Sequence, residues 1–411
     1  MKLLKIVAVL AALVALGAVA QADNANRIYG KITTVDGDVF EGLIRWDKNE
    51  ASWVDQLDGT KELPDRDRDR LRRKGRNSKS RVEVFGITIA KSGDSWNWSG
   101  SAQSGIRFGH IARLEPIDDD RAMITLQSGE KIELSGGSTD LGANIREIII
   151  EDTDEGEIEL LWDDIDNIEF SSTDPSLESD FGERLYGTLT TRRGDTFTGY
   201  VTWDVDEVFN SDILDGEERD RSRKIQFDKI ASIKRYSSSG ATVNLQNGES
   251  LVLRGTNDVD DSNRGIIIGD PDFGQVIVDW DEFDRLDFKH PARDVSYADF
   301  KESHSLKGTV YTEDGDKFTG TIRWDDDEES TWEILDGDYR DIQFDIEFGK
   351  IKTIEKRSSR TSTVTLRDGR QFRLRGSNDV DSDNKGIFIS TDGGEEVVVE
   401  WDEFSRVEFS N

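Results

Sequence analysis

The chain has 411 residues, with 86 Asp and Glu against 53 Lys and Arg, no Cys and a formal net charge of −33. This length exceeds what one hydrophobic core usually serves, so we expect several domains. The charge disfavours nucleic acid and anionic membrane surfaces as partners, because both are negative. The lack of cysteine excludes disulfides and cysteine-ligated metal sites.

Residues 1–22 have the composition of a cleaved signal peptide. Lys2 and Lys5 supply a positive start, residues 6–19 form an apolar run, and a small-x-small pattern precedes Asp23. No later stretch approaches the ~18 apolar residues of a membrane-spanning helix. We therefore expect a protein without a membrane span that is exported to the periplasm or the extracellular space.

A long internal repeat fills the rest of the chain. The phrase at residues 374–387 occurs almost unchanged at 253–266, a spacing of 121 residues (374 − 253), and many Gly, Trp, Asp and Phe positions recur at that spacing. A related but longer copy comes first, because it contains an insertion at about residues 60–101. We predict three tandem repeats, at 23–170, 171–289 and 290–411.

Each repeat begins with a predicted β-hairpin. In the first repeat, residues 29–35 and 39–46 are strand-like and flank a turn at Asp36-Gly37. The same pattern returns at 186–203 and 307–324. Alternating apolar residues on both sides of an Asp-Gly turn are a strong hairpin signal.

The second half of each repeat has the same order of elements as the first. In the third repeat, residues 363–374 form a hairpin, a variable loop follows, and strands are predicted at 386–390, 396–400 and 406–409. No window shows a sustained helical period. We predict an all-β protein in which each repeat consists of two consecutive five-stranded units.

Five short strands, with a tight corner before the last, resemble the Sm-like and SH3-like small β-barrels. Closure of such a barrel removes exposed strand edges. In the Sm-like family an Asp and an Asn after the second strand contact RNA, and an Arg-Gly pair follows later. Asp379 and Asn384 could stand in that loop, but Arg375-Gly376 precedes it. The resemblance therefore implies the fold and not RNA binding.

The variable loops of the second and third repeats are candidate calcium sites. Their Asp and Asn residues alternate as ligands do in oxygen-rich calcium loops, although the EF-hand pattern is not met. Asp and Asn also favour turns, so a purely structural loop is the alternative. The corresponding loop of the first repeat has only one acid, which confines the prediction to the other two. The candidate ligands are Asp258, Asp260, Asp261, Asn263, Asp379, Asp381, Asp383 and Asn384.

The tryptophans fall into two groups. Those in phase with the repeat are each followed by Asp, and we expect the rings to fill the core while the Asp side chains bond backbone amides at the corners. Trp96 and Trp98 lie in the insertion and are candidates for contact with a ligand, or for covering the insertion's own strand. The basic run at 64–76 is either a docking segment or a solvated loop. The in-phase residues are Trp46, Trp162, Trp203, Trp280, Trp324 and Trp401.

Catalytic signals are few. His110, His290 and His304 are the only histidines, and His110 aligns with Lys229 and Lys350, which indicates an exposed position. We found no His-x-x-x-His spacing and no phosphate-binding loop.

We therefore expect an exported, non-enzymatic protein that serves as a binding or envelope-structural module, with a protein or another envelope component as its partner. The first alternative is a binding protein that depends on calcium or contacts carbohydrate. A hydrolase is the second alternative, and no cofactor other than calcium is expected.

Overall fold

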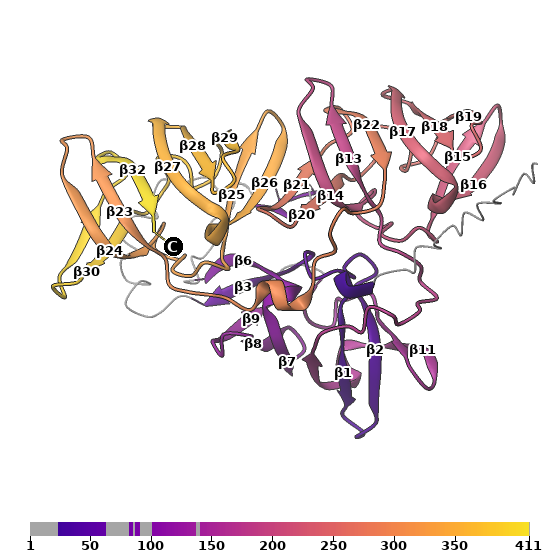
Figure 1. Ribbon diagram of the computed structural model, residues 1–411, viewed down its shortest axis with the longest axis horizontal. Coiled ribbons are helices and arrows are strands. Elements are labelled where there is room, and N and C mark those ends of the chain that lie inside the picture. Colours follow the sequence, from indigo (N-terminus) through magenta and orange to yellow (C-terminus); the bar gives the residue numbers. More distant parts are fainter. Residues whose placement is uncertain (1–23, 63–81, 85–86, 91–100, 137–139, 411) are drawn as a thin grey trace, which may run out of the picture.

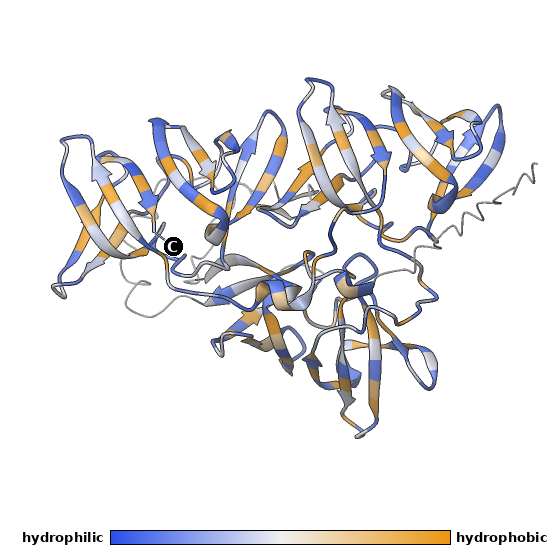
Figure 2. Ribbon diagram, viewed as in Figure 1, coloured by the Kyte–Doolittle hydropathy of each residue, from blue (hydrophilic) through white to orange (hydrophobic). Residues whose placement is uncertain are grey.

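The strands of the protein are short and antiparallel, and many have one buried face. The computed structural model describes residues 24–62, 82–84, 87–90, 101–136 and 140–410. In strand β8 (Arg121–Leu126), for example, buried and half-buried residues alternate as expected for one buried face. Figure 2 shows this alternation as hydrophobic and hydrophilic bands along the strands. The all-β prediction is confirmed, since the helical segments in the described residues are 3₁₀ turns of three or four residues.

Repeat 1, as defined above, contains strands β1 to β12. Ten of them form one sheet, and β4 pairs with β5 apart from it. The elements are η1 (Asn24–Asn26), β1 (Tyr29–Thr34), β2 (Val39–Trp46), β3 (Gln56–Glu62), β4 (Val82–Val84), β5 (Ile87–Ala90), β6 (Ser101–Arg107), η2 (Phe108–His110), β7 (Ile111–Asp118), β8, β9 (Lys131–Ser135), β10 (Ile148–Asp152), β11 (Gly156–Leu160), η3 (Trp162–Asp164) and β12 (Ile165–Phe170).

The ten-stranded sheet of repeat 1 consists of two nested units. The outer unit has the order β11-β10-β2-β1-β12, and the inner unit has the order β7-β8-β9-β3-β6. The chain completes the inner unit between β2 and β10, and the pairing of β12 with β7 joins the two. The structure thus keeps five strands per unit but not their predicted consecutive order. The hairpins of the two halves are alike in sequence, so their residues do not reveal which hairpin completes which unit.

Repeats 2 and 3 follow the same nested arrangement. Their inner hairpins, β15 with β16 and β25 with β26, are each paired with the backbone of the rest of their own repeat by one isolated β-bridge. Repeat 2 consists of β13 (Tyr186–Thr191), β14 (Thr196–Thr202), β15 (Ile213–Glu218), β16 (Arg221–Gln226), η4 (Phe227–Lys229), β17 (Ile230–Ser237), β18 (Gly240–Leu245), β19 (Ser250–Leu253), β20 (Ile266–Asp270), β21 (Gly274–Val278) and β22 (Phe283–Phe288). After η5 (Tyr297–Phe300), repeat 3 consists of β23 (Lys307–Thr312), β24 (Lys317–Arg323), β25 (Ile334–Tyr339), β26 (Ile342–Glu347), η6 (Phe348–Lys350), β27 (Ile351–Ser358), β28 (Thr361–Leu366), β29 (Gln371–Leu374), β30 (Ile387–Thr391), β31 (Glu396–Val399) and β32 (Phe404–Phe409).

A continuous sheet joins repeats 2 and 3. Strand β21 of repeat 2 pairs antiparallel with β26 of repeat 3, with Gln275 opposite Asp345. The side-chain amide of Gln275 donates a hydrogen bond to the Asp345 carboxylate at 2.9 Å. Phe344 lies in β26 and Phe273 directly precedes β21, and their ring centroids are 6.4 Å apart. Figure 1 shows the two repeats side by side in one row, with repeat 1 below their junction.

Repeat 1 is fastened to repeat 2 by buried arginines. Arg184 donates to both carboxylate oxygens of Asp55, at 2.8 and 3.1 Å, and both side chains are almost fully buried. The guanidinium of Arg27 lies 4.3 Å from the ring centroid of Phe209. Planar guanidinium groups suit such bidentate and stacked contacts.

Repeat 1 also docks on repeat 3 through buried charges. Lys61 binds the carboxylate of Glu333, and His110 Nε2 lies 3.0 Å from Glu347 Oε1. Burial by itself raises the pKa of Glu347, but His110 and Arg107 outweigh it and lower this pKa to about 2. His110 is only 3% exposed, so the prediction of an exposed position was wrong. Of the aligned lysines, Lys229 is exposed and Lys350 is half-buried.

Candidate cation site in the Trp-Asp turns

A buried tryptophan is the last residue of β2 in repeat 1 and directly follows β14 and β24 in repeats 2 and 3. Trp46, Trp203 and Trp324 are 0% exposed, and the remaining three in-phase tryptophans are 2–3% exposed. The indole N–H of Trp203 donates to the carbonyl oxygen of Asp258 at 3.0 Å, and Trp46 and Trp324 make the equivalent bond at 2.9 and 3.1 Å. The predicted core packing of these rings is confirmed.

The aspartate that follows each of these three tryptophans holds the variable loop. Asp204 has φ of 52°, and the next residue is also left-handed, as a turn of type I′ requires. Its Oδ1 accepts the amide N–H of Arg264 at 2.6 Å, and its Oδ2 accepts the Arg264 guanidinium at 2.8 Å and the Asn257 side chain. Asp47 and Asp325 bind their own loops in the same way.

Asp258 and Asp379, two of the predicted calcium ligands, are buried, and each accepts a backbone N–H from the third strand of its repeat. Asp258 Oδ2 accepts the amide N–H of Asp215 at 2.6 Å, and Asp379 Oδ2 accepts that of Asp336 at 2.9 Å. Asp258 and Asp379 are 4% and 1% exposed. They therefore clamp the loop against the third strand of the repeat.

Most of the remaining predicted ligands belong to local turns. Asp260 Oδ1 accepts the amide and the hydroxyl of Ser262, and Asn263 Oδ1 accepts the amide of Gly265. Asp381 and Asn384 make the corresponding turn bonds in repeat 3. Such bonds are typical of Asp and Asn in turns. Asp261 and Asp383 are exposed.

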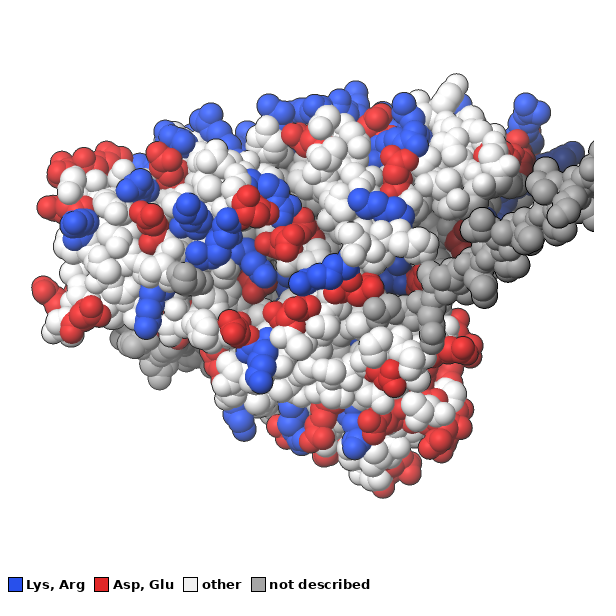
Figure 3. Space-filling model, viewed as in Figure 1, with Lys and Arg blue, Asp and Glu red and all other residues white. Residues whose placement is uncertain are grey.

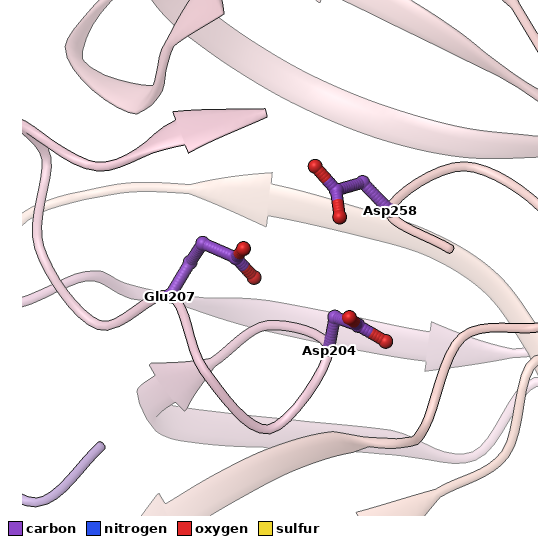
Figure 4. Close-up of side chains that lie close together, drawn as sticks. All are labelled: Asp204, Glu207 and Asp258. Atoms are coloured by element: carbon purple, nitrogen blue, oxygen red, sulfur yellow. The ribbon is translucent and has the colours of Figure 1, made fainter. Parts of the chain in front are cut away.

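One cluster of carboxylates in the described residues has a spacing suitable for a metal ion. Asp204, Glu207 and Asp258 each place an oxygen within 4.8 Å of the others. Figure 4 shows that Asp204 and Glu207 come from the same turn and that Asp258 faces them from the variable loop. Of the eight predicted ligands, the structure brings only Asp258 into this cluster.

Glu207 is the distinctive member of the cluster. Its Oε2 has no hydrogen-bond partner among the described residues. Burial and the neighbouring carboxylates of Asp258 and Asp204 raise its pKa to about 9. Burial also raises the pKa of Asp258 to about 6. Glu207 is therefore a neutral acid at pH 7 unless a cation replaces its proton.

Repeats 1 and 3 contain equivalents of Glu207. Glu50 and Glu328 are 3% and 7% exposed, and each has an oxygen without a hydrogen-bond partner among the described residues. Burial and adjacent carboxylates raise the pKa of both well above the usual value. In repeat 3 the ammonium of Lys385 lies 3.0 Å from Asp325, in the position that the Arg264 guanidinium takes beside Asp204 in repeat 2.

The sequence contains a signal for these glutamates that our predictions missed. Each is the fourth residue after an in-phase tryptophan, as in Trp203 and Glu207. The variable loops contain more acids, but each of these glutamates has a buried oxygen without a hydrogen-bond partner among the described residues. Trp96, Trp98 and the basic run at 64–76 lie outside the described residues.

Comparisons with family models, with curated proteins and with solved structures found no match. In the described residues, no helix is both long and apolar enough to cross a membrane. Both signs of charge are interspersed over the face seen in Figure 3, so the acidity is not concentrated in one patch there.

Proposed function

We propose that the protein is an exported, non-enzymatic structural or binding module of the cell envelope, built from three repeats of paired small barrels similar to the SH3-like and Sm-like folds. The observation that carries the proposal is the way the repeats are joined. Buried ion pairs such as Arg184 with Asp55 and Lys61 with Glu333 fix repeat 1 to the other two. This arrangement favours a body that holds several surfaces in fixed positions.

The strand order supports the barrel assignment. In the outer unit, four strands form a meander and the fifth, β12, returns to pair with β1. A 3₁₀ turn precedes β12, as expected for the tight corner of a small barrel.

Cell fractionation tests the proposed role. The expected result is a chain in the exported fraction that begins at Asp23, as shown by mass spectrometry, and that cross-links to an envelope component. A variant without residues 6–19 serves as the control and should stay unprocessed in the cytoplasm. An unprocessed full-length chain in the cytoplasm would contradict export, and an exported chain without an envelope partner would contradict the structural role.

A second candidate function, a calcium-dependent binding module, is favoured by the cluster around Glu207. Hard cations prefer several carboxylate and carbonyl oxygens. Asp204 already binds Arg264 and Asn257, so a cation would depend on the unpartnered oxygen of Glu207 together with Asp258. The cluster places these oxygens close together without a bond between Glu207 Oε2 and the protein.

Thermal melting with calcium and then with a chelator tests the cation site. Millimolar calcium should raise the midpoint of the wild-type protein, because binding to the folded state stabilises it. Glu207→Gln should abolish the shift, whereas Asp261→Asn, at an exposed position of the same loop, should retain it. The absence of a wild-type shift, or an equal shift in Glu207→Gln, would rule out this site.

A further inference from the structure

The junction between repeats 2 and 3 shows how two repeats pair through the edges of their sheets. It consists of an outer-unit edge strand, β21, paired with an inner-unit edge strand, β26. The amide N–H of Glu347, at the end of β26, donates to the carbonyl oxygen of Phe273 at 2.8 Å. Because ladder bonds alternate along a strand, Gln343 and Asp345 also direct their amides toward β21.

Each partner in this junction has an equivalent strand that is unpaired along one edge. In repeat 2 the equivalent of β26 is β16, since Gln226 pairs with Ile213 as Glu347 pairs with Ile334. In repeat 3 the equivalent of β21 is β31, which pairs with β30 in the same register. Among the described residues, β16 pairs only with β15, and β31 pairs only with β30.

The two edges lie at opposite ends of the row formed by repeats 2 and 3. Strand β16 is at the right-hand end in Figure 1, and β30, the neighbour of β31, is at the left-hand end. All residues of β16 except Ile225 are exposed. In β31, Glu396 is exposed and Val397 and Val398 are half-buried.

The charges of the two edges are opposite. Strand β16 carries Arg221, Arg223 and Lys224, whereas β31 begins with Glu396 and is preceded by Glu395. Basic and acidic residues on an edge strand discourage pairing with an identical edge. Here they also make each edge complementary to the other.

We propose that β16 of one molecule pairs antiparallel with β31 of a second copy and continues the sheet head to tail. In the internal junction Asp345 lies opposite Gln275. The equivalent residue is Lys224 in β16 (345 − 121) and Glu396 in β31 (275 + 121), so the same register places Lys224 opposite Glu396. This ion pair occupies the position of the hydrogen-bonded pair Gln275 and Asp345. Because the two edges differ, the contact does not close on itself, and chains longer than a dimer can form.

The edges of β16 and β31 lack some of the contacts that β26 and β21 make in the internal junction, so the intermolecular contact should be weaker. Phe344 is replaced by Arg223 and Phe273 by Gly394, so the aromatic part of the internal junction is missing. The position of Gly274 holds Glu395, so the new pairing begins at Glu396. We therefore expect an association that depends mainly on charge and backbone hydrogen bonds and that weakens with salt.

A second copy of the chain is then one partner of the protein, and this self-association rests on the proposed structural role. Sedimentation velocity of the purified exported chain tests it. At low ionic strength the average mass should rise with protein concentration, and about 1 M NaCl, where the Debye length is ~3 Å, should reverse this. Lys224→Glu and Glu396→Lys should each weaken association about tenfold or more.

An equimolar mixture of Lys224→Glu and Glu396→Lys should regain association, because each edge then meets an opposite charge in the other variant. Ser222→Pro provides an independent test, since it removes an outward amide without a charge change. Lys317→Glu, on the exposed β23–β24 hairpin, is the matched control and should behave as wild type. Unchanged melting curves would show that the variants fold.

A wild-type chain that stays monomeric at all concentrations would overturn the inference, as would a mixture that fails to associate while the wild type does. Association that is insensitive to both charge reversals would place the contact elsewhere and would also overturn it. A monomer that still cross-links to an envelope component would leave the proposed function standing with a different partner.

Discussion

Several buried aspartates of this protein accept hydrogen bonds from backbone N–H groups. Asp258 binds the Asp215 amide with its carboxylate and the Trp203 indole with its carbonyl oxygen. A buried N–H that loses its acceptor costs about 1–3 kcal/mol, so each such residue supports its loop substantially. The buried acids of the variable loops, Asp258 and Asp379, therefore have a structural role that does not require a ligand.

The titration of Glu207 predicts a pH dependence of stability. With a folded-state pKa of about 9 against an ordinary 4.5, this group is protonated in the folded chain and ionised in the unfolded chain between those values. Folding then takes up a proton, so the free energy of unfolding falls as pH rises through this window. In chelator, the stability of wild type relative to Glu207→Gln should decrease from pH 5 to pH 9, as measured by urea denaturation.

Calcium should diminish this decline, because the cation replaces the proton on Glu207. Asp261→Asn is the control and should show the wild-type pH profile. A constant difference between wild type and Glu207→Gln across the range would contradict the assigned titration.

At the residue level, the sequence predicted the buried tryptophans but only part of the site. The 121-residue spacing of Trp203 and Trp324 was sufficient to predict their burial, because a large ring that recurs in every repeat is most easily accommodated in the core. The acids were harder, since Asp258 and Asp260 look alike in sequence, yet one is buried against an amide and the other lies in a local turn. Burial and hydrogen-bond direction distinguish them, and both depend on tertiary packing.

At the level of elements, Gly274 allows the start of β21 to lie close against β26. A Cβ atom there would lie 1.9 Å from the carbonyl oxygen of Asp345, and φ is +149°. Gly274→Ala should therefore push the two strands apart at this end of the junction and lower stability by about 1–3 kcal/mol. Hydrogen exchange should show faster exchange of the Glu347 amide, which donates across this junction.

Gly393→Ala is the matched control for this prediction. A Cβ at Gly393 would meet only the hydroxyl of Thr391 at 3.7 Å, so stability and the exchange of Glu347 should stay close to wild type. Unchanged protection of Glu347 in Gly274→Ala would show that the junction tolerates the extra atom.

The positions of the strands could be predicted from the sequence more easily than the pairing between them. Alternating residues on both sides of an Asp-Gly turn defined the hairpin of β1 and β2, because that signal is local. The pairing of β2 with β10 could not be predicted, since Trp46 lies opposite Ile148 far along the chain. Several hairpins have compatible apolar faces, and only the packed structure selects among them.

At the level of the whole molecule, the pair of Lys61 and Glu333 tests whether the repeats form one body. Their side chains are 12% and 5% exposed. Lys61→Met should lower stability by about 3–5 kcal/mol, because it leaves a buried carboxylate without its cation. Urea denaturation should then show repeat 1 separating before the global transition.

Adding Glu333→Gln to Lys61→Met should recover part of the loss, because the neutral amide oxygen can still accept the Ser330 amide that Glu333 binds at 2.7 Å. The exposed substitution Lys317→Met should change stability by less than about 0.5 kcal/mol. Equal effects of Lys61→Met and Lys317→Met would argue that the repeats are only loosely attached.

We expect the nested strand order to affect the order in which strands pair during folding. In repeat 1, Trp46 pairs with Ile148, which lies 102 residues later in the chain (148 − 46). In repeat 2, Thr202 pairs with Ile267, which lies only 65 residues later (267 − 202). Contacts of high contact order form slowly, and the waiting strands expose apolar edges that invite aggregation. When the chain emerges N-terminus first, the β1–β2 hairpin remains longest without its partner strand β10. We therefore expect misfolding to begin in repeat 1.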